Sequence, residues 1–292
     1  MLVVGDHAGP VNGLAFAPDG RGLVSIAKGG RAVVWDLAGG PTTDGPSESE
    51  SATALAVDPS SGAIATADGS ARIHLWRPGR NGARLLGRFD APVSALGYLA
   101  GGSLLAIGIG NRLDAAEPGE VRLLRLSDGR EVRRFPESNG AWQVAAVPRH
   151  KLLAWSNGAR RVAIVDLSRQ DAFVFPPLKQ PASSLALSSD RRYLAAGDDW
   201  AIRIWELDRR EEIARLAGHK GRILALSFAL DGRTLLSGSD DARVIAWDVT
   251  DGRVRSEVDW DIGGVTALAV SPDGAIIAAG SDRGRVVAWD VE

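Results

Sequence analysis

The chain of 292 residues contains no cysteine, only one methionine and only four histidines. Without cysteine it has no thiol nucleophile, no disulfide, and no zinc or iron–sulfur site that needs a thiolate ligand. Long apolar runs are also missing, and the first apolar stretch is only Met1–Val4, so we expect neither a leader nor a membrane span. Arginine strongly outnumbers lysine, and alanine and glycine abound, a composition typical of a GC-rich bacterial coding sequence. We therefore expect a cytoplasmic protein without a membrane partner.

An excess of basic charge is absent as well. The formal net charge is -2, whereas surfaces that bind nucleic acid through phosphate contacts are usually strongly basic. The sequence therefore predicts no nucleic-acid partner. Local basic clusters occur at Arg149–Lys151, Arg191–Arg192 and Arg209–Arg210, interspersed with acidic residues in predicted turns. We interpret them as a solvated rim, with a binding patch as the alternative.

What the sequence does contain is a tryptophan followed by an acidic residue at a nearly fixed interval. The pairs are Trp35-Asp36, Trp205-Glu206, Trp247-Asp248 and Trp289-Asp290. When the sequence is aligned with itself at this interval, the repeat positions between these pairs are occupied by Trp76-Arg77, Leu124-Arg125 and Val165-Asp166. Intervals of about 40 to 45 residues are the period of a repeat architecture, so seven units cover the chain.

Each unit has the pattern of four short strands. In the sixth unit the three inner runs are Ile223–Phe228, Thr234–Ser239 and Val244–Asp248, separated by the turn pairs Asp231-Gly232 and Asp240-Asp241. With Gly218-His219 ahead of the first run and Trp247-Asp248 closing the third, the unit resembles the WD40 repeat family, and the resemblance extends over the whole chain. It implies an all-β fold, a seven-bladed β-propeller with four-stranded antiparallel blades.

The ends of the chain predict how the ring closes. The chain finishes in the third strand of the seventh unit, and Leu2–Val4 stands ahead of the first innermost strand. We expect this N-terminal segment to be the outer strand of the last blade, which pairs an otherwise free sheet edge. The whole chain, 1–292, is then a single domain with blades at about 5–45, 46–86, 87–132, 133–175, 176–215, 216–257 and 258–292 plus 1–4.

The outer strand of the first blade is poorly specified. The segment Pro41–Glu48 contains two prolines and few apolar residues, which makes a poor strand. We expect this edge to be mobile or missing, and the strand inside it to be partly open to a partner strand as an alternative.

Four residues of the sixth blade match the hydrogen-bond network of the family. The resemblance assigns them as His219, a hydroxyl from Ser237 or Ser239, Asp241 and Trp247. It implies a structural network, not a catalytic triad, so we expect no catalytic residues and no enzyme. In the first blade His7, Ser25 and Trp35 recur, but Gly29 takes the place of the aspartate. No second histidine or carboxylate stands at the spacing of a metal site, so we expect neither metal nor cofactor.

Departures from the repeat point to a partner surface. Trp200 and Trp260 lie outside the repeat position, in loops that open on the face that the family most often uses for partners. Exposed tryptophan is uncommon and is enriched in binding hot spots. The candidate partner-binding residues are Trp200, Trp260, Asp198, Asp240, Asp261, Arg283, Gln143, Arg112 and Asp114.

Several members of that set have further support in the sequence. Gln143 belongs to a polar ring expected around the channel mouth, and the aspartates of the same face would suit a basic peptide. Arg112 and Asp114 lie in a surplus segment, Gly110–Gly119, of the third blade. Long loops on rigid scaffolds often carry recognition, although a tolerated insertion is equally compatible.

These observations favour a non-enzymatic scaffold or regulatory module that binds a protein or peptide partner, with membership of a larger assembly expected. The alternative is a small-ligand or enzymatic propeller that uses the channel mouth. Fold alone does not supply function, so this prediction depends partly on the resemblance.

Overall fold

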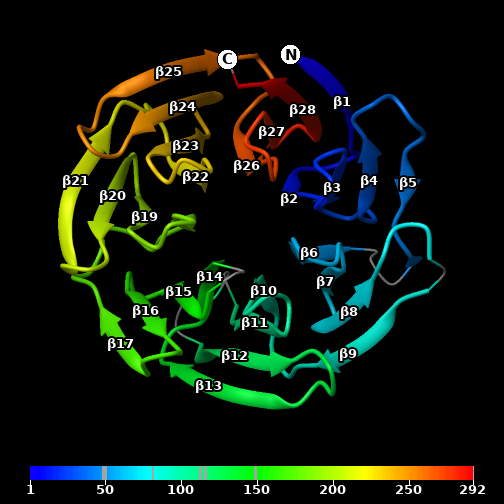
Figure 1. Cartoon of the computed structure of the whole chain (residues 1–292), viewed down its shortest axis with the longest axis horizontal. Helices are drawn as coiled ribbons and strands as arrows, with labels where there is room; N and C mark the ends of the chain where they lie inside the picture. Colours follow the sequence, from blue (N-terminus) through cyan, green and yellow to red (C-terminus); the bar gives the residue numbers. More distant parts are fainter. Residues whose placement is uncertain (48–50, 81, 112–113, 115–116, 148–149, 292) are drawn as a thin grey trace.

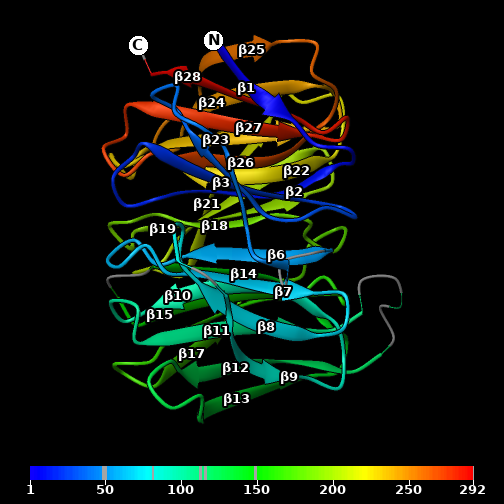
Figure 2. The ribbon, with the colours of Figure 1, turned by 90° about the vertical axis from the view of Figure 1, so that its right-hand side faces the viewer.

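Seven four-stranded antiparallel sheets stand around a central axis in the computed structural model (Figure 1). The structure describes residues 1–47, 51–80, 82–111, 114, 117–147 and 150–291, and over these residues it contains no α-helix. Figure 2 views the ring edge-on, so that its two loop-bearing faces point to the left and right. The predicted all-β, seven-bladed propeller is confirmed.

Within each blade the strands run in order from the axis to the rim (Figure 1). Blade 1 comprises β2 (Val11–Phe16), β3 (Gly22–Ala27), β4 (Val33–Asp36) and β5 (Thr43–Asp44), and blade 2 comprises β6 (Ala52–Val57), β7 (Ile64–Asp68), β8 (Arg72–Trp76) and β9 (Arg84–Arg88). Blade 3 comprises β10 (Val93–Leu99), β11 (Leu104–Ile109), β12 (Gly119–Arg125) and β13 (Glu131–Glu137), and blade 4 comprises β14 (Ala141–Val147), β15 (Leu152–Asn157), β16 (Val162–Asp166) and β17 (Asp171–Val174). Blade 5 comprises β18 (Leu185–Leu187), β19 (Tyr193–Asp198), β20 (Ala201–Glu206) and β21 (Glu211–Ala217), and blade 6 comprises β22 (Ile223–Phe228), β23 (Thr234–Ser239), β24 (Arg243–Asp248) and β25 (Val254–Asp259). Blade 7 comprises β26 (Val265–Val270), β27 (Ile276–Ser281), β28 (Arg285–Asp290) and, from the other end of the chain, β1 (Leu2–Asp6).

The N-terminal strand closes the ring, as predicted. β1 pairs antiparallel with β28, with Leu2 opposite Ala288 and Asp6 opposite Arg285. The Arg285 guanidinium also donates a hydrogen bond to Asp6 over 3.0 Å. The two termini therefore lie side by side in both views, and the last blade gains its fourth strand (Figures 1 and 2).

Glycine on the second strand lets neighbouring blades approach closely. A Cβ atom at Gly238 would lie 2.4 Å from Val265 of the next blade, and one at Gly280 would lie 2.5 Å from Val11 across the closure. Real Cβ atoms do not come this close, so a side chain at either position would push two blades apart.

The outer strand of blade 1 is present but short. Thr43 and Asp44 pair with Val34 and Val33, so the expectation of a missing or mobile edge is not met at these two residues. Pro41 and Pro46 flank the pair, and because proline lacks a backbone donor this sheet edge cannot extend in the regular way.

The described part of the chain contains no helix with the length and apolar character that a membrane span needs.

Candidate partner-binding face

One face of the ring, here called the loop face, is formed by the loops that enter each innermost strand and by the hairpins that join second and third strands. In blade 6 a chain of hydrogen bonds ties these two kinds of loop together. Trp247 Nε1 donates to Ser237 Oγ over 2.8 Å, Ser237 Oγ lies 2.7 Å from His219 Nε2, and His219 Nδ1 lies 3.0 Å from Asp241. The structure thus brings the four residues of the expected network together and selects Ser237 as the hydroxyl.

The charges of this network fix the direction of its hydrogen bonds. Burial lowers the pKa of His219 below its ordinary value, an effect that Asp241 only partly offsets, so the ring is neutral. Burial alone would raise the pKa of Asp241, but hydrogen bonds from Arg243 and from the backbone of Lys220 hold it well below its usual range. A neutral imidazole beside a carboxylate carries its proton on Nδ1, and Nε2 accepts the hydroxyl proton of Ser237.

This arrangement does not suit nucleophilic catalysis. The Ser237 hydroxyl is buried, accepts the indole N–H and is held by His219. Its oxygen has no open approach for a substrate, which a nucleophile needs. Among the residues that the structure describes, no group of three or more histidine, aspartate or glutamate side chains is placed to hold a metal ion.

The first blade keeps part of the same network. His7 Nε2 lies 2.6 Å from Ser25 Oγ, and Trp35 Nε1 donates to the same oxygen over 2.7 Å. Gly29 occupies the position of the missing aspartate with a φ of 77°. His7 therefore lacks the carboxylate that orients His219.

In blade 4 an equivalent set of hydrogen bonds is formed by different residues, which the sequence analysis did not identify. Glu137 is buried and accepts hydrogen bonds from Trp155 Nε1 at 2.7 Å, Asn157 Nδ2 at 2.9 Å and Arg161 at 3.2 Å. The available signal was its spacing, because Glu137 stands four residues before its innermost strand, as His219 does. Blade 4 thus joins its loops through a glutamate and a tryptophan on the second strand.

Trp200 is the most exposed of the candidate tryptophans. It forms a two-residue hairpin with Asp199 between β19 and β20, and 58% of its surface is exposed. Asp199 has a positive φ of 65°, a conformation that tight hairpins require. The indole is therefore presented to solvent at the tip of a short, well-defined turn.

Asp198 does not lie on the surface as expected. Its side chain is buried, and one oxygen accepts the backbone N–H groups of Lys179 and Gln180 at 2.7 and 3.2 Å. It anchors the loop that enters blade 5, in the way that Asp241 accepts the N–H of Lys220 in blade 6. Asp198 cannot contact a partner without leaving these bonds.

Trp260 also departs from the expected exposure. It is half-buried and packs against Trp289, with ring centroids 3.9 Å apart. Its neighbour Asp261 has a side chain that is 98% exposed and lies 3.8 Å from Arg283. Asp240, on the hairpin of blade 6, is exposed.

The polar side chains at the channel mouth are engaged in blade-to-blade bonds. Gln143 Nε2 donates to the carbonyl of Ser183 over 2.6 Å, and the Ser183 hydroxyl donates to the carbonyl of Ile223 over 2.6 Å. Similar bonds run from Thr53 to Val93 at 3.1 Å, from Ser94 to Ala141, and from Thr266 to Val11 at 2.7 Å. These hydrogen bonds hold adjacent blades together. Most of the polar side chains expected at the channel mouth are therefore already hydrogen-bonded within the protein.

Of the third-blade loop, Asp114 is exposed, whereas Arg112 lies outside the described residues. The loop face therefore brings together Trp200, Asp240, Asp261 and Arg283 as exposed candidates from blades 5 to 7.

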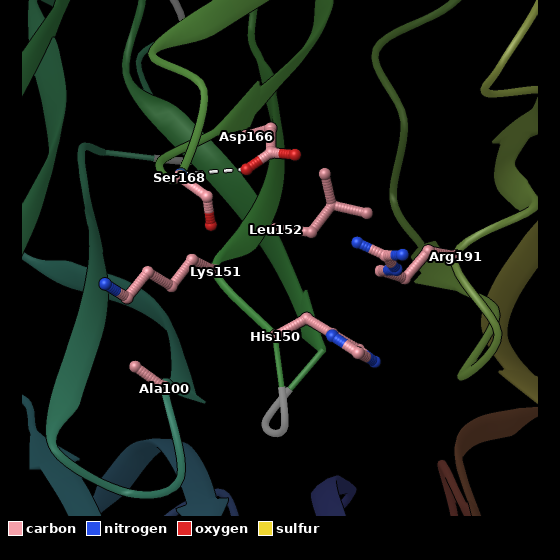
Figure 3. Close-up of a pocket in the computed structure, with 7 residues that line it drawn as sticks. All are labelled: Ala100, His150, Lys151, Leu152, Asp166, Ser168 and Arg191. Atoms are coloured by element: carbon pink, nitrogen blue, oxygen red, sulfur yellow. Dashed lines mark hydrogen bonds between the residues drawn. The ribbon is translucent and has the colours of Figure 1, made fainter.

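The opposite face carries two of the predicted basic clusters. A cavity of about 380 Å³ is lined there by His150, Lys151 and Arg191, with Leu152 between the lysine and the arginine (Figure 3). Asp166 lines the same cavity and accepts the backbone N–H of Ser168 at 2.8 Å. The lining mixes positive and negative side chains, and the interpretation of these clusters as a solvated rim stays a prediction.

The repeat pattern also matches a known family model. The model described as "WD domain, G-beta repeat" matches residues 2–36, 178–206, 210–248 and 261–290. Four of the seven blades thus match the WD40 repeat family. The matched segments are those of blades 1, 5, 6 and 7, which retain the tryptophan and acidic pair of the WD40 repeat.

One curated relative shares part of this WD40 protein. A "U3 snoRNP-associated protein-like YAOH" of Oryza sativa subsp. japonica is 45% identical over 58 residues. The match covers 18% of this chain and 11% of the relative. The chain thus spans only a small part of that relative's length.

Proposed function

We propose that this WD40 propeller is a non-enzymatic interaction scaffold that binds a protein or peptide partner on its loop face. The single observation that carries the proposal is Trp200, which is 58% exposed on a two-residue hairpin. A large, rigid aromatic side chain offers much contact area at little conformational cost, and tryptophan is the residue type most often found in hot spots. Burial of this indole in a partner's pocket would anchor the complex.

Charge around the indole suggests the character of the partner. Asp199 lies beside Trp200, and Asp240 and Asp261 are exposed on the next two blades. Exposed carboxylates favour a partner that carries lysine or arginine, and they repel phosphate groups. We therefore propose a basic protein segment and no nucleic acid as the direct ligand of this face.

A place in a larger assembly is part of the same proposal. The rice relative is named for association with a ribonucleoprotein, which supports an assembly role for a shared WD40 segment. The short shared segment carries no further detail of partner or pathway to this chain. A cytoplasmic location stays a prediction.

Capture from the lysate of the source organism tests the proposal. The baits are the native chain, Trp200→Ala, and Val132→Ala, which removes an exposed apolar side chain from the outer strand β13. We expect a protein that is retained by the native chain and by Val132→Ala but lost from Trp200→Ala, since loss of a hot spot costs about 2 kcal/mol or roughly 30-fold in affinity. Equal retention on all three baits would place the interaction elsewhere.

A further inference from the structure

The acidic residue that ends the third strand has a cationic partner in every blade that carries it except the last. The ion pairs are Asp36 with Arg21 at 3.8 Å, Asp166 with Arg169 at 3.8 Å, Glu206 with Arg209 at 3.5 Å, and Asp248 with Arg233 and Arg255 at 2.8 and 2.7 Å. Asp290, at the same position of blade 7, is exposed and forms no ion pair or side-chain hydrogen bond with the residues that the structure describes.

One of the cations that pair with this carboxylate in blade 6 has no counterpart in blade 7. Thr234 lies opposite Asp248 in blade 6, and the preceding residue, Arg233, reaches back to that carboxylate. Ile276 lies opposite Asp290 in blade 7, but the preceding residue is Ala275. One of the two guanidinium groups that pair with the carboxylate in blade 6 is thus absent in blade 7.

Asp290 stands at the edge of a groove between blades 6 and 7. The groove has a volume of about 560 Å³, within the range of pockets that hold ligands. Its apolar wall is formed by Leu230, Leu236, Val258, Val270, Ile277 and Trp289. Leu230 and Val291, at the rim, are each 51% exposed, so apolar surface continues out of the groove.

Trp289 lines this groove and is less buried than its counterparts in blades 5 and 6. The corresponding Trp205 and Trp247 are fully or almost fully buried, and Trp247 is held by the Ser237 hydroxyl. In blade 7 Ala279 takes the place of Ser237, since it lies opposite Val287 as Ser237 lies opposite Ile245. Trp289 has no such acceptor and is half-buried, with one flank on Trp260 and another lining the groove.

The charges that line the groove are mainly negative. Asp231, Asp273 and Asp290 contribute carboxylates, and Arg255 is the one cation among the described residues that line the groove. Arg255 is already committed, because it donates to Asp248 over 2.7 Å and lies 3.8 Å from Asp231. A phosphate-bearing ligand would be repelled here, whereas a cation next to apolar groups would be attracted.

We propose that this groove binds an extended protein segment that places apolar side chains on the wall around Trp289 and an arginine or lysine on Asp290. The partner then supplies to blade 7 the cation that Arg233 supplies to blade 6 from within the chain. The site lies on the outer wall between two blades, separate from the loop face, and it does not depend on the function proposed for that face.

Two model peptides test this assignment. The probes are acetyl-Leu-Arg-Leu-Val-amide and the same peptide with citrulline, which keeps the shape of arginine without its charge. Titration is followed by the indole N–H signal of Trp289 in NMR spectra, assigned with a Trp289→Phe variant. We expect saturable binding to the native chain with a preference of about tenfold for arginine over citrulline.

Substitutions at Asp290 and at Ala275 make the test more specific. Asp290→Asn should bind both peptides alike, and Ala275→Arg should lose the preference because it recreates the ion pair of Arg233 with Asp248 inside blade 7. Asp251→Asn removes the charge of an exposed carboxylate of blade 6 and keeps an oxygen that can accept the backbone N–H of Arg253, so it should behave as the native chain does. Melting temperatures verify that each variant is folded.

Any one of three results would overturn the proposal. These are equal affinity of the native chain for both peptides, a preference that persists in Asp290→Asn, or a Trp289 signal that does not saturate at millimolar peptide.

Discussion

Removal of the Asp241 carboxylate should destabilise the ring more than any exposed substitution. The side chain accepts hydrogen bonds from His219 Nδ1 and from the backbone N–H of Lys220, and it pairs with Arg243 at 2.8 Å. It is only 8% exposed, so water cannot readily replace these contacts. Asp241→Ala therefore leaves the buried Nδ1–H of His219 and the mostly buried Arg243 guanidinium without this acceptor, each at a cost of about 1 to 3 kcal/mol.

The combined effect can be stated as a measurable shift. We expect a loss of about 3 kcal/mol in the free energy of unfolding, since the donors share one carboxylate and their costs do not add fully. For a chain of 292 residues that corresponds to a fall of roughly 5 °C in melting temperature. Urea unfolding followed by tryptophan fluorescence, together with calorimetry, measures both quantities.

A matched control separates burial from charge. Asp251→Ala removes a carboxylate whose side chain is 45% exposed and lies 3.9 Å from Arg253. Exposed pairs contribute about 0 to 1 kcal/mol, so this variant should unfold close to the native chain. If Asp241→Ala changed stability no more than Asp251→Ala, the assignment of the blade 6 network as structural support would be refuted.

Three further outcomes are expected. Burial lowers the pKa of His219 and of His7 below 6.5, so the unfolded chain binds protons more readily than the folded chain. The free energy of unfolding in urea should therefore fall as the pH drops below about 6.5. If the His219→Gln variant showed the same pH dependence as the native chain, this expectation would be contradicted. Glu137→Ala should cost about 2 to 4 kcal/mol in urea unfolding, because Trp155 and Asn157 lose a buried acceptor, whereas Glu137→Gln should cost less because its carbonyl still accepts one bond; equal costs for the two variants would argue against the hydrogen bonds. Deletion of Met1 to Val4 should lower the melting temperature, because β28 loses most of its outer partner, and an unchanged value would contradict closure by β1.

The fold was predictable because its determinants repeat along the chain. Trp247-Asp248 and its counterparts mark the third strand of successive blades, and turn pairs such as Asp231-Gly232 mark the hairpins. Closure followed from the unpaired apolar segment at the N-terminus, which has one free sheet edge to cover. The same regularity located His219 and Asp241, which occupy fixed positions relative to the strands.

Exposure at the loop face was less predictable, because it depends on pairs of residues that lie far apart in the sequence. Trp260 appears in a polar loop, but its ring packs against Trp289, which is 29 residues further along the chain. Asp198 and Asp199 are adjacent and chemically identical, yet only Asp199 faces solvent. The buried one accepts N–H groups of a loop some twenty residues earlier in the chain.

The hydrogen bonds that connect the loops of the other blades were not predicted, because different residue types form them. Glu137 ends an outer strand, where glutamate is ordinarily solvated, and only the burial of Trp155 against it reveals its role. The polar residues of the channel mouth, such as Gln143, were recognised as a ring, but the carbonyl groups that they bind belong to the next blade. These hydrogen bonds can be recognised only once the relative positions of the blades are known.

The measurement that tests the central claim most directly is a hydrogen-exchange comparison of the free chain with its complex with the captured partner. The account predicts that protection is concentrated on the loop face, at the hairpin of Asp198 to Ala201 and at the neighbouring hairpin that carries Asp240, with the opposite face unchanged. Protection confined to the opposite face, around Lys151 and Arg191, would contradict it.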